Sequence, residues 1–211
     1  MTGSHRTRPP GVAAAPLSTR EEQRQLTHRR LIDAAGAVFA QRGYGGTAIG
    51  DITAAANVNR ATFYLHFANK AAALNEVYHA ITGETAKYWS RMDQALTTGT
   101  PSAVREWLNC AIGWWEEHAA ILPAAHEAAA IEPEIAGRWK SNLDELANEL
   151  HTYLDTFPAD QREDIRLKIQ LLVVQLDQAC FRSTVQRVFV IDRDHLLDIL
   201  TDIWCATLRI A

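Results

Sequence analysis

Cysteine is scarce in this sequence: Cys110, Cys180 and Cys205 are the only three, and no two of them lie close together. An odd number at such spacing indicates neither a disulfide framework nor a zinc site. The sequence also has no apolar run approaching the ~20 residues that cross a bilayer. Arg6 and Arg8 are followed by no apolar stretch of the kind found in secretory signals. We therefore expect a reduced, cytoplasmic protein with no membrane partner.

Motifs for catalysis and for cofactor binding are absent from the sequence as well. It contains no Gly-rich phosphate loop, no nucleophile elbow and no Cys-x-x-Cys. The acids and histidines at 116–118 and 126–127 match no metal-ligand spacing and are more typical of a solvated helix surface. We expect no enzyme activity, no cofactor and no bound metal.

Charge is unevenly distributed along the 211 residues. Hydrophobic residues at 47% and charged residues at 22% are ordinary for a globular protein. Residues 1–70 contain nine Lys and Arg against four Asp and Glu, a net of +5; the whole chain has −4, so residues 71–211 carry −9. A basic segment joined to an acidic body favours a protein that presents one part to phosphate, although such unevenness also arises by chance.

The segment 47–70, TAIGDITAAANVNRATFYLHFANK, has the pattern of two short helices joined by a tight turn. Thr47 and Asn59 are candidate caps for the two helices, because their side-chain oxygens can accept backbone N–H groups at a helix start. Asn57 occupies the corner, where Asn tolerates a left-handed backbone. Phe63 and Phe67 lie on the buried face of the second helix. This outline predicts a helix-turn-helix, whose second helix lies in the DNA major groove.

The same segment resembles the DNA-binding domain of the TetR family of transcriptional regulators. The resemblance extends over about residues 31–74 and includes the signature Tyr-x-His-Phe at 64–67, followed by Lys70. Three positions depart from the family pattern. Asn57 stands where Gly is usual, Ala48 where Ser or Thr is common, and Gly50 where some members carry an Arg that contacts DNA. The other matching positions are Gly43, Tyr44, Thr47, Ile49, Asp51, Ile52, Ala56, Val58, Thr62 and Leu74.

The resemblance implies which side chains contact DNA. We expect Arg60 to read a base, because its guanidinium can bind guanine O6 and N7 together. Thr62 and Tyr64 are expected to hold phosphates, and Lys70, in the first turn of the next helix, to add a phosphate contact. The full set of expected DNA-binding residues is Thr47, Asn59, Arg60, Ala61, Thr62, Tyr64, His66 and Lys70.

Helical periodicity continues through the rest of the chain. We expect an all-α protein of about nine helices: a disordered basic tail over 1–20, a three-helix helix-turn-helix domain over 21–69, and a larger helical domain over 70–211 for effector binding and dimerisation. A fourth helix over 70–97 is expected to link the domains. A single seventh helix is expected from Pro133 to the Phe157-Pro158 pair. A strand is a minor alternative at 165–191, where β-branched residues are frequent.

Aromatic residues concentrate in the middle of the chain, where members of the TetR family keep a ligand cavity. Trp107, Trp114 and Trp139 fall on or near the inward stripes of neighbouring expected helices. The resemblance implies an apolar pocket among them with a few polar anchors, although each of them fits a plain core equally well. This region also loosely resembles repressors that accommodate elongated hydrophobic ligands. The expected effector-binding residues are Trp107, Asn109, Cys110, Trp114, His126, Trp139 and Asn142.

The last two helices, expected over 164–185 and 194–209, are apolar on more than one face. A helix of that kind must be buried on several sides. We therefore expect the two helices to form a four-helix interface between two copies of the chain. The expected interface residues are Leu172, Leu176, Cys180, Leu196, Ile199, Leu200, Ile203 and Trp204.

Together these features predict a ligand-responsive transcriptional regulator, with repression as the usual sign in the family. We expect it to bind a palindromic operator as a homodimer and to be released by a small hydrophobic effector, with the fourth helix as the lever between the domains. Three alternatives stay open at this point: an activator, a helical DNA-binding regulator without an effector, and a helical enzyme or carrier in which DNA binding is vestigial.

Overall fold

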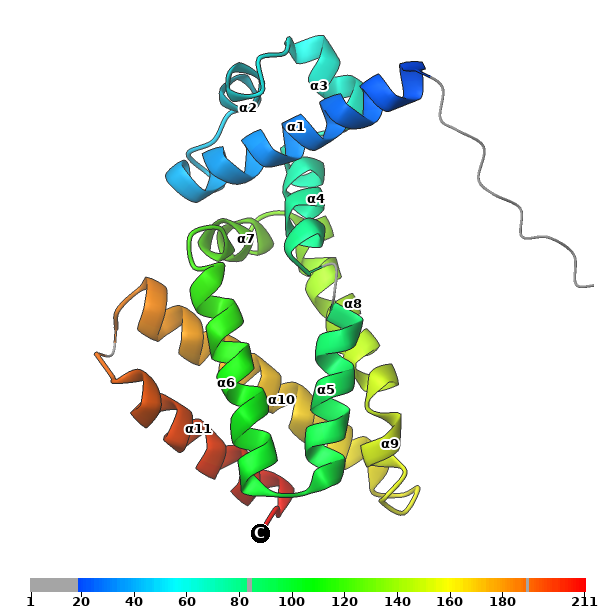
Figure 1. The fold of residues 1–211 in the computed structure, drawn as a ribbon, viewed down its shortest axis with the longest axis vertical. Coiled ribbons are helices and arrows are strands. Elements are labelled where there is room, and N and C mark those ends of the chain that lie inside the picture. Colours follow the sequence, from blue (N-terminus) through cyan, green and yellow to red (C-terminus); the bar gives the residue numbers. More distant parts are fainter. Residues whose placement is uncertain (1–18, 83–84, 189) are drawn as a thin grey trace, which may run out of the picture.

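The computed structural model describes residues 19–82, 85–188 and 190–211, and every regular element within those ranges is helical. The helices form two tiers, with a small N-terminal group above a larger bundle (Figure 1). This confirms the all-α fold with a helix-turn-helix domain followed by a larger helical domain. The elements are α1 (Thr19–Arg42), α2 (Ile49–Ala55), α3 (Arg60–His66), α4 (Lys70–Thr82), α5 (Thr85–Thr98), α6 (Pro101–Glu117), α7 (Leu122–Ala129), α8 (Pro133–Glu149), α9 (His151–Leu154), α10 (Arg162–Cys180), a π-helical turn η1 (Phe181–Val185) and α11 (Arg193–Leu208).

The first helix begins two residues inside the predicted tail. Thr19 and Arg20 lie in α1, so this end of the predicted tail is helical, while residues 1–18 of that tail lie outside the described ranges. The helix ends at Arg42, and Gly43 follows it with φ +70°, the left-handed backbone that glycine adopts without strain.

The N-terminal helices α1, α2 and α3 share one apolar core. Leu31, Phe39, Ile52 and Phe63 have at most 1% of their surface exposed. Each such side chain stabilises the fold by ~1.5–3 kcal/mol relative to an exposed position. That contribution is needed because an isolated helix of seven residues, the length of α3, does not form in water. Tertiary burial therefore holds α3 in place.

Two helices link the tiers: α4, which ends at Thr82, and α5, which begins at Thr85. Residues 83–84 lie outside the described ranges, so the single helix predicted over 70–97 stays a prediction there, and the described residues on both sides of that gap are helical. α4 packs against α1, α7 and α8, and its residues Ala71, Leu74 and Val77 belong to the N-terminal core.

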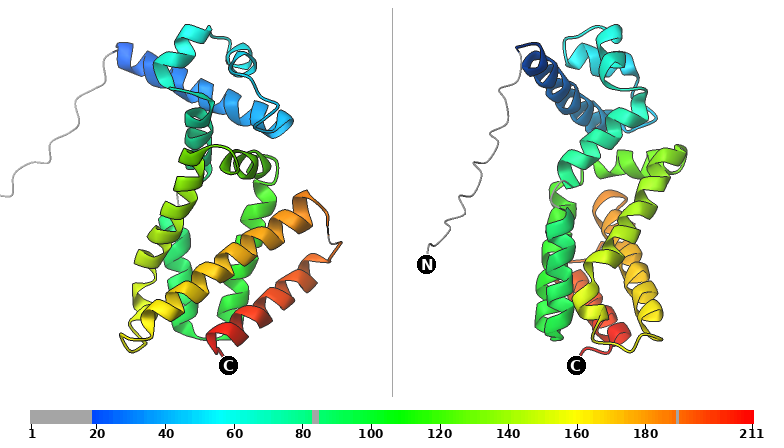
Figure 2. Two further views of the ribbon diagram at one scale, coloured as in Figure 1. Left: turned by 180° about the vertical axis from the view of Figure 1, so that it is seen from behind. Right: turned by 90° about the vertical axis from the view of Figure 1, so that its right-hand side faces the viewer.

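The larger bundle consists of α5, α6, α8, α10 and α11 (Figure 2). α6 packs between α5 and α11, and the rings of Trp107 and Trp204 meet there with their centroids 5.2 Å apart. Leu108, Leu146 and Ile169 are fully buried in the same core. Within the described ranges, no helix is long and apolar enough to cross a bilayer.

Two further bounds differ from the sequence-based expectation. The predicted seventh helix divides into α8 and α9, because the buried carboxylate of Asp93 accepts the N–H of Tyr153 at 2.8 Å and draws it out of the helical pattern. Residues 165–180 lie in α10 and residues 181–185 in η1, so the strand alternative is wrong over that stretch. With these divisions the described ranges contain eleven α-helices rather than about nine.

The short helix α7 belongs to both tiers. Ala124 and Ala128 of α7, with Ile135 of α8, are buried in the same core as Leu31 and Phe63. On the other side, Leu122 of α7 is buried in the core of the larger bundle. α7 therefore lies at the junction of the two tiers, directly beneath α1 (Figure 1).

Candidate functional site

The corner between α2 and α3 has the geometry that the sequence predicts. Asn57 has φ +51°, a left-handed backbone that Asn tolerates better than most residues. Arg30 of α1 donates from Nη2 to the carbonyl of Ala56 at 2.7 Å, and the N–H of Val58 donates to Thr53 O at 3.0 Å. The turn is thus bonded both to α1 and to α2.

Helix α3 presents a polar face to solvent. The Asn59 side chain accepts the backbone N–H of Thr62 at 2.8 Å, which confirms the predicted cap. Phe63 and Phe67 are buried on one side, while Arg60 and Tyr64 are exposed on the other, with Arg60 Nη2 3.5 Å from the Tyr64 hydroxyl. Of the other expected DNA-binding residues on this segment, Asn59 and Ala61 are exposed and Thr62 is half-buried.

His66 lies at the end of α3 beside a second histidine. Its ring centroid is 5.4 Å from that of His28, and the His28 ring stacks on Phe67 at 5.0 Å. Burial lowers the pKa of His66, and the nearby charges of His28 and Arg24 lower it further. The half-buried His66 side chain therefore favours the neutral form more than a free histidine does.

Thr47 and Lys70 are placed differently from the expectation. Thr47 is buried, and its hydroxyl donates to Gly43 O at 2.7 Å instead of capping α2. The Lys70 ammonium donates to the carbonyls of Tyr44 at 2.7 Å and Thr47 at 3.0 Å, and it lies 4.0 Å from the centroid of the Tyr44 ring. The free carbonyls of the loop draw both side chains inward, so neither offers its polar group to a phosphate in this arrangement.

The start of α2 is stabilised by Asp51 instead of Thr47. The Asp51 carboxylate accepts the Ala48 N–H at 2.9 Å and forms an ion pair with Arg42 at 2.7 Å. These interactions, the backbone bond foremost, lower the pKa of Asp51. A carboxylate at this position also interacts favourably with the positive end of the helix dipole.

Two acidic residues contact the α1–α2 loop from the larger bundle: Glu127, which the sequence-based interpretation assigned to a solvated helix surface, and Glu132, which it did not single out. Glu127 of α7 accepts the N–H groups of Tyr44 at 2.7 Å and Gly45 at 3.0 Å, and Glu132, after α7, accepts the Tyr44 hydroxyl at 2.6 Å. Burial and the bond to Glu132 raise the pKa of Tyr44 well above its usual value. The run of glycines at 43, 45 and 46 was the available signal, since glycines mark places where another group approaches the backbone closely.

The expected effector-binding residues separate into two groups. Trp107 is buried against Trp204 as part of the core, and Trp114 stacks on His118 with centroids 4.7 Å apart. Asn109 and Cys110 are exposed and do not face the bundle interior, because successive helical residues are rotated by about 100° and the inward stripe of α6 passes through Leu108 and Ala111 instead. Asn109 Oδ1 accepts a hydrogen bond from Arg193 at 2.7 Å.

The second group gathers between α7, α8 and α10. The His126 ring stacks on Phe181 with centroids 4.4 Å apart and meets the edge of Trp139 at 5.0 Å. His126 Nε2 lies 3.4 Å from an Asp177 carboxylate oxygen, without the alignment of a hydrogen bond. Asn142 hydrogen-bonds the Tyr78 hydroxyl, and burial, with the Asp177 charge, raises the pKa of Tyr78 to about 12. We call His126, Trp139, Phe181 and Asp177 the His126 cluster.

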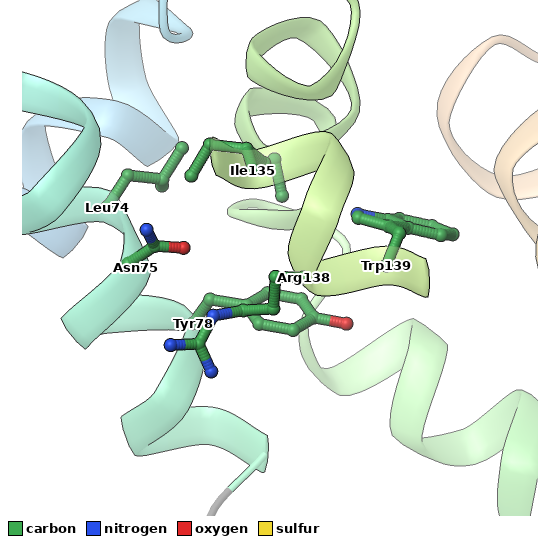
Figure 3. Close-up of a pocket in the computed structure, with 7 residues that line it drawn as sticks. Leu74, Asn75, Tyr78, Ile135, Arg138 and Trp139 are labelled. Atoms are coloured by element: carbon green, nitrogen blue, oxygen red, sulfur yellow. The ribbon is translucent and has the colours of Figure 1, made fainter. Parts of the chain in front are cut away.

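A small cavity lies next to this cluster, between α4, α7 and α8 (Figure 3). Its volume is about 10 Å³, roughly the space that one water occupies. Asn75, Tyr78, Arg138 and Trp139 are among its lining residues, and the buried Oδ1 of Asn75 has no hydrogen-bond partner. The cavity as it stands is too small for an effector.

The expected interface residues are mostly committed to the core of a single chain. Leu172, Leu176, Cys180, Leu200 and Trp204 are at most 5% exposed, and Leu196 is half-buried against the core. Only Ile199 and Ile203, at 38% and 37% exposure, face outward from α11. The apolar residues that α10 exposes are others: Leu167, Leu171 and Val174. The sequence-based interpretation assigned the inward faces of α10 and α11 to the interface. Both faces of these helices are apolar, so helical periodicity alone does not show which one is buried in the core.

Comparison with known proteins finds similarity in the N-terminal residues. Residues 31–77 match the model for bacterial regulatory proteins, tetR family. A probable acrEF/envCD operon repressor of Escherichia coli K12 is 46% identical over 52 residues, which cover 25% of this chain and 24% of the repressor. The HTH-type transcriptional repressor DhaR of Mycobacterium sp. GP1 is 45% identical over 49 residues, or 23% of this chain and 25% of DhaR. The match thus spans about a quarter of these curated relatives.

Solved structures extend the similarity in fold to most of the chain. A TerR/AcrR-family transcriptional regulator from Aquifex aeolicus VF5 superposes with a TM-score of 0.61 at 14% identity, covering 85% of this chain and 98% of that one. A putative TetR-family regulator from Mesorhizobium loti gives a TM-score of 0.62 at 18% identity, covering 87% and 97%. At these identities the likeness concerns the fold alone.

Proposed function

We propose that this chain is a member of the TetR family of bacterial regulatory proteins, whose model matches residues 31–77, and that it regulates transcription by binding double-stranded DNA through α3. The observation that carries the proposal is the construction of α3: a capped helix, fixed by Phe63 and Phe67, with Arg60 and Tyr64 exposed on its outer face. This is how a recognition helix enters a major groove. Arg60 is the proposed base-reading residue.

We propose that the DNA-bound form is a homodimer and that the sign of regulation is repression. The exposed residues Leu167, Leu171, Val174, Ile199 and Ile203 give α10 and α11 an apolar outer face that a second copy would cover. A two-fold dimer places its recognition helices about 34–36 Å apart, so its operator is a palindrome. The matched relatives from Escherichia coli and Mycobacterium are named as repressors, which supports repression here.

The effector site that we propose is the His126 cluster with Tyr78 and Asn142. Its aromatic rings and few polar groups suit a small hydrophobic molecule. Because the adjoining cavity has only about 10 Å³, such a molecule must displace Phe181 or Trp139 to enter. The same small volume favours a second candidate, a DNA-binding regulator whose pocket is filled by its own side chains.

A selection from random double-stranded DNA tests the DNA-binding proposal. Sequencing of the bound fraction is expected to show one two-fold symmetric sequence with half-sites a helical turn apart. Arg60→Ala should lower discrimination at one base pair of each half-site by ~1–3 kcal/mol. Lys140→Ala on α8 removes a positive charge far from α3 and serves as the control. Enrichment of no sequence, or an unchanged sequence with Arg60→Ala, would contradict the proposal.

A thermal-shift screen of small hydrophobic compounds separates the two candidates, since a ligand of the native state raises the unfolding temperature. A hit that loses its effect in Trp139→Ala, and that releases the selected DNA, would support the effector-responsive regulator. If every compound that releases DNA acts equally on Trp139→Ala, the His126 cluster is not the effector site.

A further inference from the structure

The loop between α1 and α2 is held by charged side chains from two directions. Lys70 donates to its carbonyls, and Glu127 of α7 accepts two successive N–H groups, those of Tyr44 and Gly45. We propose that Glu127 is a positioning residue that anchors the helix-turn-helix to the larger bundle, and that α7 transmits changes in the His126 cluster to this anchor. The role of this anchor in regulation rests on the proposed DNA binding through α3. The contact between Glu127 and the loop does not depend on that proposal.

The anchor is chemically specific. One carboxylate bonds two adjacent backbone N–H groups through its two oxygens, Oε2 to Tyr44 and Oε1 to Gly45. Hydrogen bonds to a charged acceptor are about twice as strong as neutral ones. Glycine at 45 is required for this approach, since a Cβ there would lie 2.6 Å from Glu127 Oε1. The loop is thus built to receive this carboxylate.

The two contacts on the loop differ in what they connect. Lys70 lies in the first turn of α4, next to Ala71 and Leu74 of the N-terminal core, so its bonds to Tyr44 and Thr47 tie α4 to that same core. Glu127 reaches the loop from a helix that also packs into the larger bundle. For this reason the polar contacts that join the two tiers at this loop come from Glu127 of α7 and from Glu132 after it, and not from the start of α4. In this proposal α7 acts as a lever between the tiers, and the role expected of the fourth helix stays a prediction.

The loop leads directly into α2, which begins at Ile49, and α2 positions α3 through the corner at Asn57. A shift of Glu127 consequently changes how α3 is held relative to the larger bundle. In a two-fold dimer that orientation sets the separation of the two recognition helices, which must match successive major grooves.

The His126 cluster lies one residue from the anchor. His126 and Glu127 are consecutive on α7, so their side chains point about 100° apart: His126 against Phe181 and Trp139, Glu127 against the loop. α7 has only eight residues and carries both contacts. A molecule that pushes the His126 ring away from Phe181 therefore acts on the same short helix that holds Glu127.

Amide exchange of the full-length, DNA-free protein tests the anchor residue by residue. In Glu127→Gln one carboxylate oxygen becomes an NH₂ group that cannot accept, so the Tyr44 and Gly45 amides should exchange about tenfold faster than in the wild type. Glu117→Gln, exposed at the end of α6, makes the same charge change and should leave both rates unaltered. Equal rates in the wild type and Glu127→Gln would overturn the anchor.

Gly45→Ala releases the same contact from the opposite side. The backbone of Gly45 is not left-handed, and the atom that its new Cβ would meet is the mobile end of Glu127, so the carboxylate should move aside while the loop keeps its fold. Gly50→Ala, whose Cβ would meet nothing within 4 Å, is the matched control. Because both changes break one contact, Gly45→Ala combined with Glu127→Gln should accelerate exchange no more than either alone. Multiplicative effects would refute a shared contact.

The transmission through α7 has its own measurement. Phe181→Ala removes the ring stacked on His126 without touching Glu127, and it should raise the exchange rate of the Gly45 amide at least about threefold. An unchanged rate would show that the cluster and the anchor are independent. The exchange measurements require no DNA, so a failure to select an operator would refute the proposed function and leave the anchor untouched. If an operator is selected, and the wild type and Glu127→Gln bind it equally well although the variant exchanges faster, the positioning role of Glu127 is refuted and the proposed function stands.

Discussion

Replacing Lys70 with methionine decides between two roles for this residue. Methionine keeps most of the side-chain volume but removes the ammonium that donates to Tyr44 O at 2.7 Å and Thr47 O at 3.0 Å. If the structure describes its role, Lys70→Met destabilises the free protein. If Lys70 is instead the phosphate ligand that its position in the sequence suggests, the substitution weakens DNA binding and leaves stability unchanged.

The size of the effect follows from the contacts. A hydrogen bond that involves a charged group contributes ~1.5–3 kcal/mol. Lys70 is half-buried, so water replaces part of what is lost and we take the lower end for the pair together, about 2 kcal/mol. The cation–π contact with Tyr44 adds little at such a site. With a urea m-value of about 2 kcal/mol/M, the unfolding midpoint should fall by about 1 M.

The assay is urea unfolding followed by circular dichroism, beside the salt dependence of DNA binding. Lys140→Met is the control, because Lys140 is 83% exposed and its ion pair with Asp144 lies on the surface of α8. Its midpoint should stay within about 0.2 M of the wild type. If the Lys70→Met midpoint also stays within about 0.2 M of the wild type, and the salt slope of DNA binding falls by about one, the structural role is refuted and Lys70 is a phosphate ligand.

Other predictions test the core, the pH response and the outer face. Phe63→Ala, which empties the fully buried centre beneath α3, should cost ~3–5 kcal/mol and abolish DNA binding, as urea unfolding and gel shift would show; an intact affinity would mean that α3 needs no such support. His66 has a lowered pKa in the folded state, so the unfolded chain binds more protons and stability should fall as the pH drops below about 6.5. In His66→Gln the unfolding temperature should fall less between pH 7.5 and 5.5 in thermal melts. An unaltered decline would show that another group causes it. Leu171→Asp, on the exposed face of α10, should yield a monomer in sedimentation, whereas Leu26→Asp, the same change at an exposed leucine of α1, should not. A persistent dimer in Leu171→Asp would place the interface on another surface.

The features that the sequence predicted correctly are local ones. The cap at Asn59 and the left-handed corner at Asn57 each depend on a residue and its neighbours within four positions. The cap at Asn69 behaves in the same way, since its side chain accepts the Ala72 N–H at 2.7 Å. Such signals are visible in a sequence because the atoms that interact are close along the chain.

The features that the sequence did not predict depend on contacts between distant residues. Lys70 is 26 residues from Tyr44, and Glu127 is 83 residues from it. A lysine in the first turn of a helix can equally face a phosphate or a carbonyl, and only the folded loop decides which one it meets. The division of α8 from α9 likewise depends on Asp93, which is 60 residues from Tyr153.

Taken alone, the sequence determined the helical class, the helix-turn-helix and the residues on the outer face of α3, because period and capping are properties of short segments. The tertiary structure decided which apolar stripe of α10 and α11 is inside, how little space remains beside Trp139, and that Glu127 holds the α1–α2 loop. Each of these depends on which helices become neighbours. That choice is made by packing the whole chain into shared cores, and no single segment carries it.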